Sequence, residues 1–405
     1  MRLNMRKIFA AALLVCLVLP VVAAGKWYGS PRHPNVFGTK PLPISIRSSR
    51  RPANGSSSGA AVSGDNRKTR LAAFHSSASN LVRHDTNGKT DVFVWRRPRG
   101  RRGLRLTHLA GKLILASVNG HWDQGNGDST NPSLDGSLTS PPHCVAFQST
   151  ATNLNARDSD RVSDIFVRNL RTGRTYLVSR GIDARATNAS IDGHCHRVAF
   201  EAGGWIWIGS AHGRFRHRLR MGSQPNYSRD GRALVWTHKG YVWIRRDGVT
   251  SRVGPGRNPR VSDRETGLWG VSFESRRRLT RNDHDHYADV YLRVIGRHGG
   301  AHRTLLASIV RGKDAYNGGI TAYGQNRGIV VFGIHEGHGS GLWYFNKHTG
   351  HADDLAVTTH GTIYGIATSA RANFVAFSAK QRLSSLDRSR HTTVYFKHLV
   401  DGQSY

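Results

Sequence analysis

The stretch Asp91-Val92-Phe93-Val94, preceded across a polar loop by Leu71-Ala72-Ala73-Phe74, decides the fold. The same pair of short apolar segments returns twice in closely similar form, as Val145-Ala146-Phe147 with Asp164-Ile165-Phe166-Val167 and as Val271-Ser272-Phe273 with Asp289-Val290-Tyr291-Leu292. Self-similarity at such a spacing is typical of a repeat architecture. The chain is therefore expected to repeat one small unit, and its function must come from residues placed on that scaffold.

The repeat predicts strands arranged in blades. The first segments end at aromatic residues roughly 50 residues apart on average, namely Phe74, Phe147, Phe200, Trp236, Phe273, Phe332 and Phe377. Short runs of Val, Ile, Phe, Tyr and Trp favour strands, and the Gly, Asn, Asp and Ser clusters between them favour turns. Because four strands per repeat around an axis make a β-propeller blade, we predict an all-β propeller of four-stranded blades. Seven blades fit the repeat count, with six or eight as alternatives.

Two copies of the repeat carry a resemblance to a known family. They run from Asn80 to Val94 and from Asn153 to Val167, and in each a polar Asp-rich loop leads into Asp-Val-Phe-Val or Asp-Ile-Phe-Val. This pattern resembles the TolB-like β-propeller repeat, over about residues 70–400, and the resemblance implies a propeller scaffold. Residues 25–67 are too short and too polar for the α/β domain of TolB. No Gly-x-Ser-x-Gly elbow of an accompanying hydrolase domain follows the repeats.

The N-terminus predicts a secretory signal. Arg2, Arg6 and Lys7 precede an apolar stretch from Ile8 to Val22, and small residues follow at Ala23 and Ala24. We expect residues 1–24 to be a signal peptide, with an uncleaved anchor as the alternative. Residues 25–67, rich in Pro, Ser, Gly and Arg, are expected to be a disordered linker, and residues 68–405 to form the propeller. The protein is accordingly expected to be secreted or to lie in the cell envelope.

The last repeat and the cysteines give two further expectations. The repeat from Phe374 to Leu399 lacks room for its own outer strands, so a strand from the N-terminal region would close the ring. Cys144 and Cys195 precede equivalent strands of neighbouring repeats, and thiols outside the cytosol tend to be oxidised, so a disulfide is predicted. A metal site formed with the flanking residues His143, His194 and His196 is the alternative, although its spacing matches no known signature.

Three loops repeat one spacing of oxygen-bearing side chains, at offsets 0, 2 and 6. These are Asp85, Asn87 and Asp91; Asp158, Asp160 and Asp164; and Asp283, Asp285 and Asp289. Oxygen ligands in a tight loop suit Ca²⁺, so the nine residues are candidate calcium ligands, and no other cofactor is expected. Asp and Asn also cap turns through hydrogen bonds to the backbone, which is the favoured interpretation.

The charge of the chain points to anionic partners. Its formal net charge is +33, from 59 Lys and Arg against 26 Asp and Glu. Candidate binding residues lie in two basic runs, Arg96, Arg97, Arg99, Arg101 and Arg102, and Arg214, Arg216, Arg218 and Arg220. Both runs fall at expected outer strands or their turns, so they are predicted to form one basic edge. A solvated face that guards the strand edges against aggregation is the alternative.

These observations favour a non-catalytic extracytoplasmic scaffold that binds an envelope protein or an anionic envelope polymer. The signal sequence argues against nucleic acid as the partner, and membrane contact is expected only peripherally or through an uncleaved signal anchor. Two alternatives remain. A propeller enzyme acting on polysaccharide, either a glycosidase or a lyase, would place a pair of buried acids at the central channel. Binding to nucleic acid or a lipid surface by charge alone would weaken steeply with salt.

Overall fold

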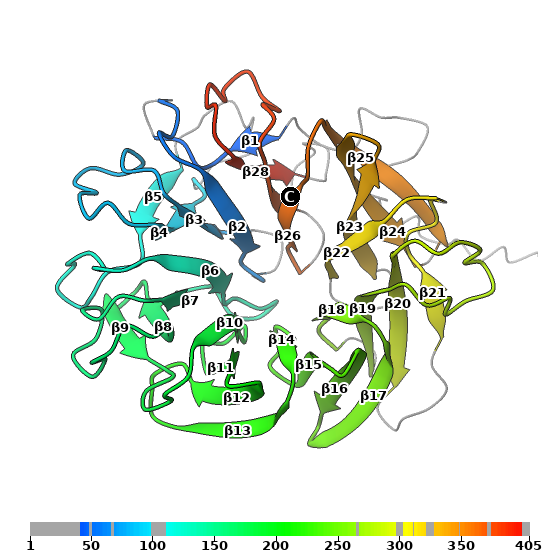
Figure 1. Ribbon diagram of the computed structural model, residues 1–405, viewed down its shortest axis with the longest axis horizontal. Coiled ribbons are helices and arrows are strands. Elements are labelled where there is room, and N and C mark those ends of the chain that lie inside the picture. Colours follow the sequence, from blue (N-terminus) through cyan, green and yellow to red (C-terminus); the bar gives the residue numbers. More distant parts are fainter. Residues whose placement is uncertain are drawn as a thin grey trace, which may run out of the picture.

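The protein is a ring of antiparallel sheets around a central axis (Figure 1). The computed structural model describes residues 41–47, 51–65, 69–98, 111–264, 267–296, 303–310, 312–320, 328–347, 349–370 and 374–398. Within these ranges the chain forms 28 strands in seven four-stranded sheets, and it forms no helix. The predicted all-β propeller with seven four-stranded blades is confirmed.

Six blades follow the chain from the axis outward. Blades 1 to 3 consist of β2 (Ser57–Val62), β3 (Leu71–Ser76), β4 (Asp91–Arg96) and β5 (Lys112–Leu115); β6 (Ser129–Leu134), β7 (Cys144–Ser149), β8 (Asp164–Asn169) and β9 (Arg174–Leu177); and β10 (Ala186–Ile191), β11 (Arg197–Ala202), β12 (Trp205–Ser210) and β13 (Arg216–Met221). Blades 4 to 6 consist of β14 (Ser223–Tyr227), β15 (Ala233–His238), β16 (Tyr241–Arg246) and β17 (Val249–Pro255); β18 (Arg257–Val261), β19 (Leu268–Ser275), β20 (Asp289–Gly296) and β21 (Thr304–Leu306); and β22 (Ala315–Ile320), β23 (Ile329–Glu336), β24 (Gly339–Asn346) and β25 (His351–Thr359).

Blade 7 joins the two ends of the described chain. It consists of β26 (Tyr364–Thr368), β27 (Phe374–Ala379), β28 (Thr393–His398) and, outermost, β1 (Leu42–Pro43). Leu42 lies opposite Phe396, and Pro43 lies opposite Tyr395. The amide of Ile44 then donates to the carbonyl of Val394 at 2.9 Å. The prediction that an N-terminal strand closes the ring is confirmed.

The structure differs from the linker expected over residues 25–67. Both β1 and β2 lie in this segment, and β2 is the innermost strand of blade 1. Its residues are small because the innermost strands crowd together at the axis: a Cβ added at Gly365 of blade 7 would stand 3.0 Å from the amide nitrogen of Ala60. The low apolar content that suggested disorder thus reflects close packing. Residues 1–40, with the predicted signal, lie outside the described ranges.

Aromatic pairs across the second and third strands form the core of the blades. Phe147 stacks on Phe166 at 6.0 Å between ring centroids, and both are fully buried. The equivalent pairs are Phe74–Phe93, Phe273–Tyr291 and Phe377–Tyr395. Phe147 and Phe166 share one apolar cluster with Val92 and Val94 of blade 1, so the rings also seal neighbouring blades. Burying one such side chain stabilises the fold by ~2 kcal/mol.

The inner strands contain bulges that link each blade to the one before it. Asn188 and Gln224 occupy the left-handed region at these bulges, with φ of 54° and 56°. The amide of Asn188 donates to Gln148 Oε1 of blade 2 at 3.1 Å, and that of Gln224 donates to Glu201 Oε1 of blade 3 at 2.6 Å. Side chains of one blade therefore satisfy the amides that the bulge of the next blade frees from the ladder.

Over the described ranges, no helix has the length and hydropathy of a membrane span.

Candidate functional site

The three acidic loops lie between the second and third strands of blades 1, 2 and 5. In each, the last acid begins the third strand and accepts a hydrogen bond from a serine that follows the fourth strand. The pairs are Ser117–Asp91, Ser179–Asp164 and Ser308–Asp289. The same serine oxygens accept the amides of Val92, Ile165 and Val290 at 3.1, 2.8 and 2.9 Å. Each acid–serine pair thus ties the third strand to the loop after the fourth.

The earlier residues of each triplet hold the loop itself. Asp160 Oδ1 accepts the amide of Val162 at 2.7 Å, and Asp285 Oδ1 accepts that of Tyr287 at 3.0 Å. In blade 1, Asn87 Oδ1 accepts the amide of Lys89 at 3.0 Å, while its Nδ2 donates to Gly125 O at 2.9 Å. Asp85, the first of that triplet, is buried. These are the turn-capping bonds that Asp and Asn typically make.

The acidic triplets offer few oxygens to a cation. One oxygen from each of Asp158, Asp160 and Asp164 lies within 4.8 Å of the others, and the same holds for Asp283, Asp285 and Asp289. Ca²⁺ takes roughly six to eight oxygens, so the others would have to come from second carboxylate oxygens, backbone carbonyls or water. Blade 7 builds the corresponding loop with one acid: Asp387 Oδ1 accepts the amide of Ser389 at 2.8 Å, and Thr393 takes the last position. Turn capping therefore accounts for the positions of these side chains in the loops.

Burial changes the titration of the last acid in each triplet. It raises the pKa of Asp91, Asp164 and Asp289 to about 6. The serine hydrogen bond opposes this rise, and the neighbouring carboxylates add to it. The three side chains are therefore partly protonated slightly below neutral pH.

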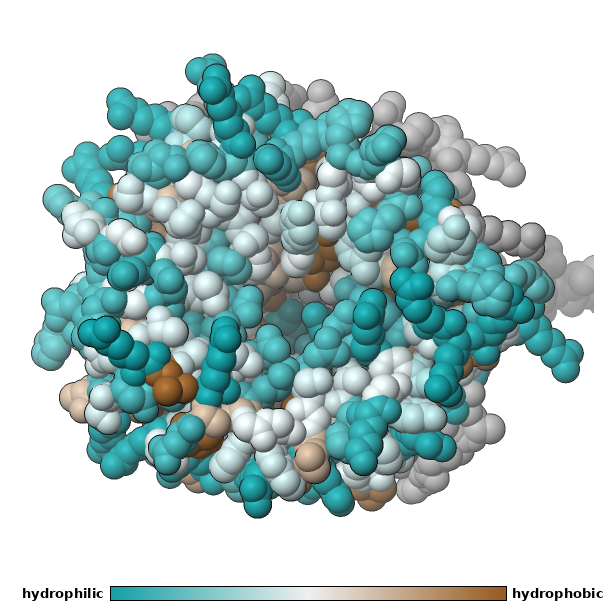
Figure 2. Space-filling model, in the orientation of Figure 1, coloured by the Kyte–Doolittle hydropathy of each residue, from teal (hydrophilic) through white to brown (hydrophobic). Residues whose placement is uncertain are grey.

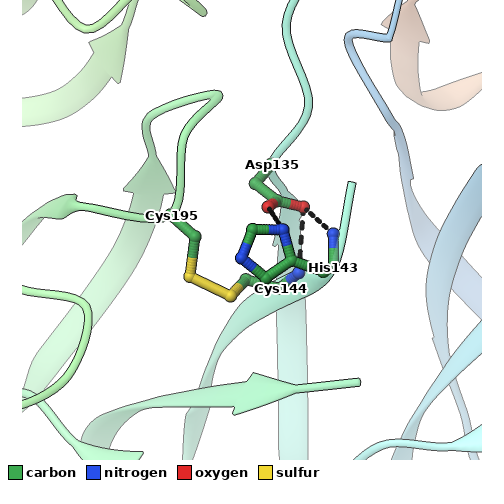
Figure 3. A group of neighbouring side chains, drawn as sticks. All are labelled: Asp135, His143, Cys144 and Cys195. Carbon is green, nitrogen blue, oxygen red and sulfur yellow. Dashed lines mark hydrogen bonds and ion pairs between the residues drawn. A yellow bond between two sulfur atoms is a disulfide. The ribbon is translucent and has the colours of Figure 1, made fainter. Parts of the chain in front are cut away.

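A disulfide between Cys144 and Cys195 joins blade 2 to blade 3, with the Cα atoms 6.0 Å apart. Figure 3 shows Asp135 and His143 beside it. Asp135 Oδ1 accepts the amides of His143 and Cys144, each at 2.9 Å, and Oδ2 lies 3.1 Å from His143 Nδ1. Because both sulfur atoms are bonded to each other, neither is a thiolate that binds metal. His194 and His196 stack on each other at 5.9 Å.

The two basic runs lie in different blades. Arg96 ends β4 of blade 1 and is exposed, whereas the guanidinium of Arg97 lies 4.4 Å above the ring of Phe374 in blade 7. The candidates Arg99, Arg101 and Arg102 lie outside the described residues. The second run belongs to blade 3, and blade 2 stands between it and blade 1. The described parts of the two runs therefore form separate surfaces, not one basic edge.

The second run lies on the outer strand of blade 3, as predicted. Arg216, Arg218 and Arg220 lie on β13 and are exposed, and the exposed Arg214 precedes the strand. Among the described strands, β13 pairs with β12 alone, so no described strand pairs with its other edge. In the part of the chain that the structure describes, no acidic side chain forms an ion pair with any of the four.

Aromatic rings hold arginines on the outer strands of two neighbouring blades. The guanidinium of Arg218 lies 4.1 Å above Trp205, and that of Arg252 lies 4.8 Å above Tyr241. The two positions are equivalent, because Arg218 lies opposite Trp207 and Arg252 lies opposite Trp243 in their ladders. Stacking fixes the plane of a guanidinium and leaves its N–H groups free to donate to an anion.

Acidic side chains are buried more often than basic ones in the described part of the chain. Eleven acidic side chains are buried in the described part of the chain, among them Asp91, Asp164, Asp289 and Glu274, but only three basic ones, Arg168, Arg246 and Lys397. The acids serve the interior, as caps of turns and bulges, while the other described arginines and lysines are exposed or partly exposed. The surface is therefore more strongly basic than the composition alone indicates.

An Asp-Gly turn follows the inner strand of blades 2, 3 and 4, at Asp135-Gly136, Asp192-Gly193 and Asp230-Gly231, and these turns lie together at one end of the central channel. The turn backbones bond to one another across blades, with Gly136 N donating to Gly193 O at 3.0 Å and Gly193 N to Arg229 O at 2.8 Å. Among the described residues that line the channel cavity, Asp263 is the one acid. Its Oδ1 accepts the amide of Asp230 at 2.8 Å. The pair of channel acids expected of a polysaccharide-cleaving enzyme is therefore not found among these residues.

Five residues of interest escaped the sequence analysis. They are Trp205, Tyr241 and Arg252 on the outer strands, and Arg229 and Arg260 at the channel. The repeated aromatic-x-Trp that begins β12 and β16 was a usable signal for the first group. The two channel arginines break the repeat, because they replace the small residues that other blades carry, but this is visible only once the blades are aligned in space.

Comparison with known proteins finds similarity to solved structures alone. No protein-family model and no curated protein matches it. The β-propeller domain of the Trilobed protease from Pyrococcus furiosus is similar with a TM-score of 0.48 and 14% identity, over 87% of this chain and 97% of that one. TolB from Acinetobacter baumannii gives 0.36 and 14%, over 62% and 54%. A puromycin-hydrolyzing peptidase from Mycobacterium tuberculosis gives 0.49 and 13%, over 84% and 52%, so the aligned region spans about half of the last two chains.

Proposed function

We propose that this chain is a non-catalytic extracytoplasmic propeller that binds an anionic polymer of the cell envelope at the outer strands of blades 3 and 4. The arginine edge is defined as Arg214, Arg216, Arg218 and Arg220 of blade 3 with Arg252 of blade 4. One observation carries the proposal. Three exposed arginines lie on β13, whose outer edge pairs with no described strand, a fourth precedes the strand, and no acid of the described chain forms an ion pair with any of them.

The spacing of the arginine edge suits a polymer. Alternate residues of a strand stand about 7 Å apart, so Arg216, Arg218 and Arg220 form a short row of cations along β13. A polymer that repeats a carboxylate or phosphate engages several of them at once, and each guanidinium offers a planar pair of donors. The half-exposed rings of Trp205 and Tyr241 lie beneath the stacked arginines and add apolar surface beside the charge.

The remaining acids support a scaffold role. The carboxylates that repeat along the chain cap turns and tie strands, as Asp164 does with Ser179. General acid–base catalysis on a sugar needs two carboxyl groups that face a common substrate, and the described channel lining offers one. Because these carboxylates stabilise the fold, the arginine edge is the strongest candidate for recognition of a partner.

The extracytoplasmic location rests on two supports. Residues 1–24 have the composition of a secretory signal. The buried Cys144–Cys195 disulfide is a bond that persists in oxidising compartments. Outside the cytosol, the anionic macromolecules that meet the protein are envelope polymers and lipid headgroups, which favours these over nucleic acid.

The test is capture of partners from envelope extract by the full chain at low and high salt. The edge variant replaces Arg214, Arg216, Arg218 and Arg220 by Gln. The control variant replaces four exposed loop arginines, Arg157, Arg281, Arg388 and Arg390, by Gln and so loses the same charge. We expect the wild type and the control to retain an anionic polymer and the edge variant to lose it. Equal loss in both variants would show binding by net charge alone, and turnover of a polysaccharide without a retained partner would favour the enzyme.

A further inference from the structure

At one position of the inner strands, the side chain accepts a hydrogen bond from a backbone amide of the next blade. Ser133 Oγ of blade 2 accepts the amide of Ile191 in blade 3 at 3.2 Å, and Ser190 Oγ accepts that of Tyr227 in blade 4 at 2.9 Å. Asn226 Oδ1 continues the series by accepting the amide of Val261 in blade 5 at 3.0 Å. At this position, a small polar side chain thus joins each inner strand to the next.

Blade 5 breaks the series with Arg260. This residue lies opposite Ser272, just as Ser190 lies opposite Ala199 and Asn226 opposite Val235, so the position is the same. A guanidinium has donors and no acceptor, and Arg260 therefore does not repeat the contact of the other blades. Its one side-chain hydrogen bond in the described structure goes from Nη1 to the carbonyl of its own neighbour Pro259, at 3.0 Å. It takes part in no ion pair with a described acid.

The residues that follow Arg260 around the ring leave space for a ligand. The equivalent positions are Gly319 in blade 6, Ala367 in blade 7 and Ala61 in blade 1. These small residues and Arg260 line a channel cavity of about 390 Å³, to which the inner strands of all seven blades contribute. That volume falls within the range of about 300–1,000 Å³ that is typical of small-ligand sites. In Figure 2 the centre of the ring is hollowed.

A second arginine adds positive charge at the channel. Arg229 reaches from blade 4 to the carbonyls of Val62 in blade 1, at 2.9 Å, and Leu134 in blade 2, at 3.2 Å. It lies close against the Gly64 turn, where an added Cβ would stand 2.3 Å from its Cδ. The described cavity lining thus contains two arginines and a single acid, Asp263. Asp263, Asp65 and Asp135 interact electrostatically with Arg229, and Glu274 does so with Arg260, but none of these described acids forms an ion pair with either arginine. An anion that bonds directly to a guanidinium removed from bulk water would stabilise it further.

We infer that the channel is a second binding site, separate from the arginine edge, in which the guanidinium of Arg260 binds the carboxylate of a small acidic ligand. A carboxylate matches the planar pair of guanidinium donors. The Gly and Ala positions of blades 6, 7 and 1 leave room for the body of the ligand. Such a ligand carries its acid group on a sugar or at the end of a short peptide, and the two sources differ in what surrounds the carboxylate.

The test is calorimetric titration of the full chain with two pairs of probes. Glucuronate is compared with glucose, and alanyl-alanine with its C-terminal amide, so that each acid has a counterpart without the carboxylate. We expect one of the two acids to bind saturably at one site per chain and its counterpart not to bind. The acid that binds identifies the source of the carboxylate. Equal binding of acid and counterpart, or saturation by neither acid up to millimolar concentration, would overturn the inference.

Variants locate the site. The variant R260S gives blade 5 the residue that blades 2 and 3 carry, so we expect it to fold and to bind the acid at least 10-fold more weakly. R260K keeps the charge without the planar fork and is expected to lose part of the affinity. R157Q removes an exposed arginine of the loop between β7 and β8 that does not line the cavity, and it should bind the acid as the wild type does. Unchanged affinity of R260S for the acid would contradict the inference. The polymer experiment on the edge variant tests the arginine edge alone, so its outcome does not decide whether the channel binds a ligand.

Discussion

Leu42 lies opposite Phe396 in the last blade, so the first described strand of the chain completes the sheet to which the last strand belongs. The contact continues beyond the ladder, because the amide of Val394 donates to Ser45 Oγ at 2.9 Å. Ile44 is 1% exposed and shares an apolar cluster with Val394 and Phe396. Closure of the ring therefore depends on the short N-terminal segment from Leu42 to Ser45, which pairs with and packs against the last strand.

Truncation of Ile44 tests the closure. The variant I44A removes buried methyl groups from the cluster and is expected to lower the free energy of unfolding by about 2–4 kcal/mol. V162A is the control, because Val162 is 39% exposed and should cost much less. Urea unfolding followed by tryptophan fluorescence measures both. Equal midpoints for I44A and V162A would show that closure contributes nothing to stability.

The disulfide makes a second prediction. Cys144 and Cys195 close a loop of 51 residues between two blades, and a cross-link of this kind stabilises a fold by about 2–4 kcal/mol. We expect the C144A/C195A double variant to unfold at lower urea than the oxidised wild type and to be insensitive to dithiothreitol. A wild type whose midpoint stays the same after both thiols are shown to be reduced would contradict this account.

The close packing of the turn at Gly193 predicts that one added methyl group destabilises the fold. A Cβ at Gly193 would stand 2.3 Å from Arg229 O and 2.6 Å from Gly136 O, both backbone atoms that are held by the ring. G193A is therefore expected to destabilise the fold by at least about 2 kcal/mol. G361A is the matched control, since an added Cβ there meets nothing within 4 Å. Thermal unfolding of both variants decides the matter, and equal melting temperatures would refute the close packing of the turns.

The acids that begin the third strands predict a pH dependence. Burial raises the pKa of Asp164 from 3.8 to about 6 in the folded chain. Between these values the unfolded chain releases a proton that the folded chain keeps, so the stability from this group is full below pH 4 and is lost as the pH rises through 6. Asp91 and Asp289 act in the same direction. His75, whose pKa burial lowers from 6.5 to about 4, acts in the opposite direction over nearly all of this range.

The variant D164N isolates the effect of one acid. Asn keeps an acceptor for the hydroxyl of Ser179 and removes the titration. Relative to the wild type, D164N should gain about 1–2 kcal/mol of stability between pH 4 and pH 7. D183N removes one carboxylate from the surface and is the control for the loss of a charge. A difference between D164N and the wild type that is constant across this pH range would show that Asp164 titrates normally.

The strands that the sequence predicted are those whose apolar side chains face neighbouring blades. β7 and β8 could be recognised from Val145-Ala146-Phe147 and Ile165-Phe166-Val167, because these residues must fill the space between blades. β2 could not, since Ser57-Ser58-Gly59-Ala60-Ala61 is selected for small size at the axis and therefore looks like a linker. Composition distinguishes disorder from crowding only when the neighbours in space are known.

The binding surfaces, like the strands, could be predicted from the sequence only in part. The run Arg214–Arg220 is visible as a cluster, and its place on an outer strand follows from the repeat. That Arg218 stacks on Trp205 depends on the pairing of β12 with β13, which the sequence alone does not define. The separation of the two basic runs was missed for the same reason, because blade 2 stands between residues that appear equivalent along the chain.

The most direct measurement is the affinity of the full chain for a purified anionic polysaccharide, with polygalacturonate as the probe and neutral dextran as its counterpart. The edge variant, with Arg214, Arg216, Arg218 and Arg220 replaced by Gln, is compared with the control variant that loses Arg157, Arg281, Arg388 and Arg390. We expect the wild type and the control to bind polygalacturonate and not dextran, and the edge variant to bind at least 10-fold more weakly than the control at the same ionic strength. Equal affinities of the two variants would contradict recognition by the arginine edge.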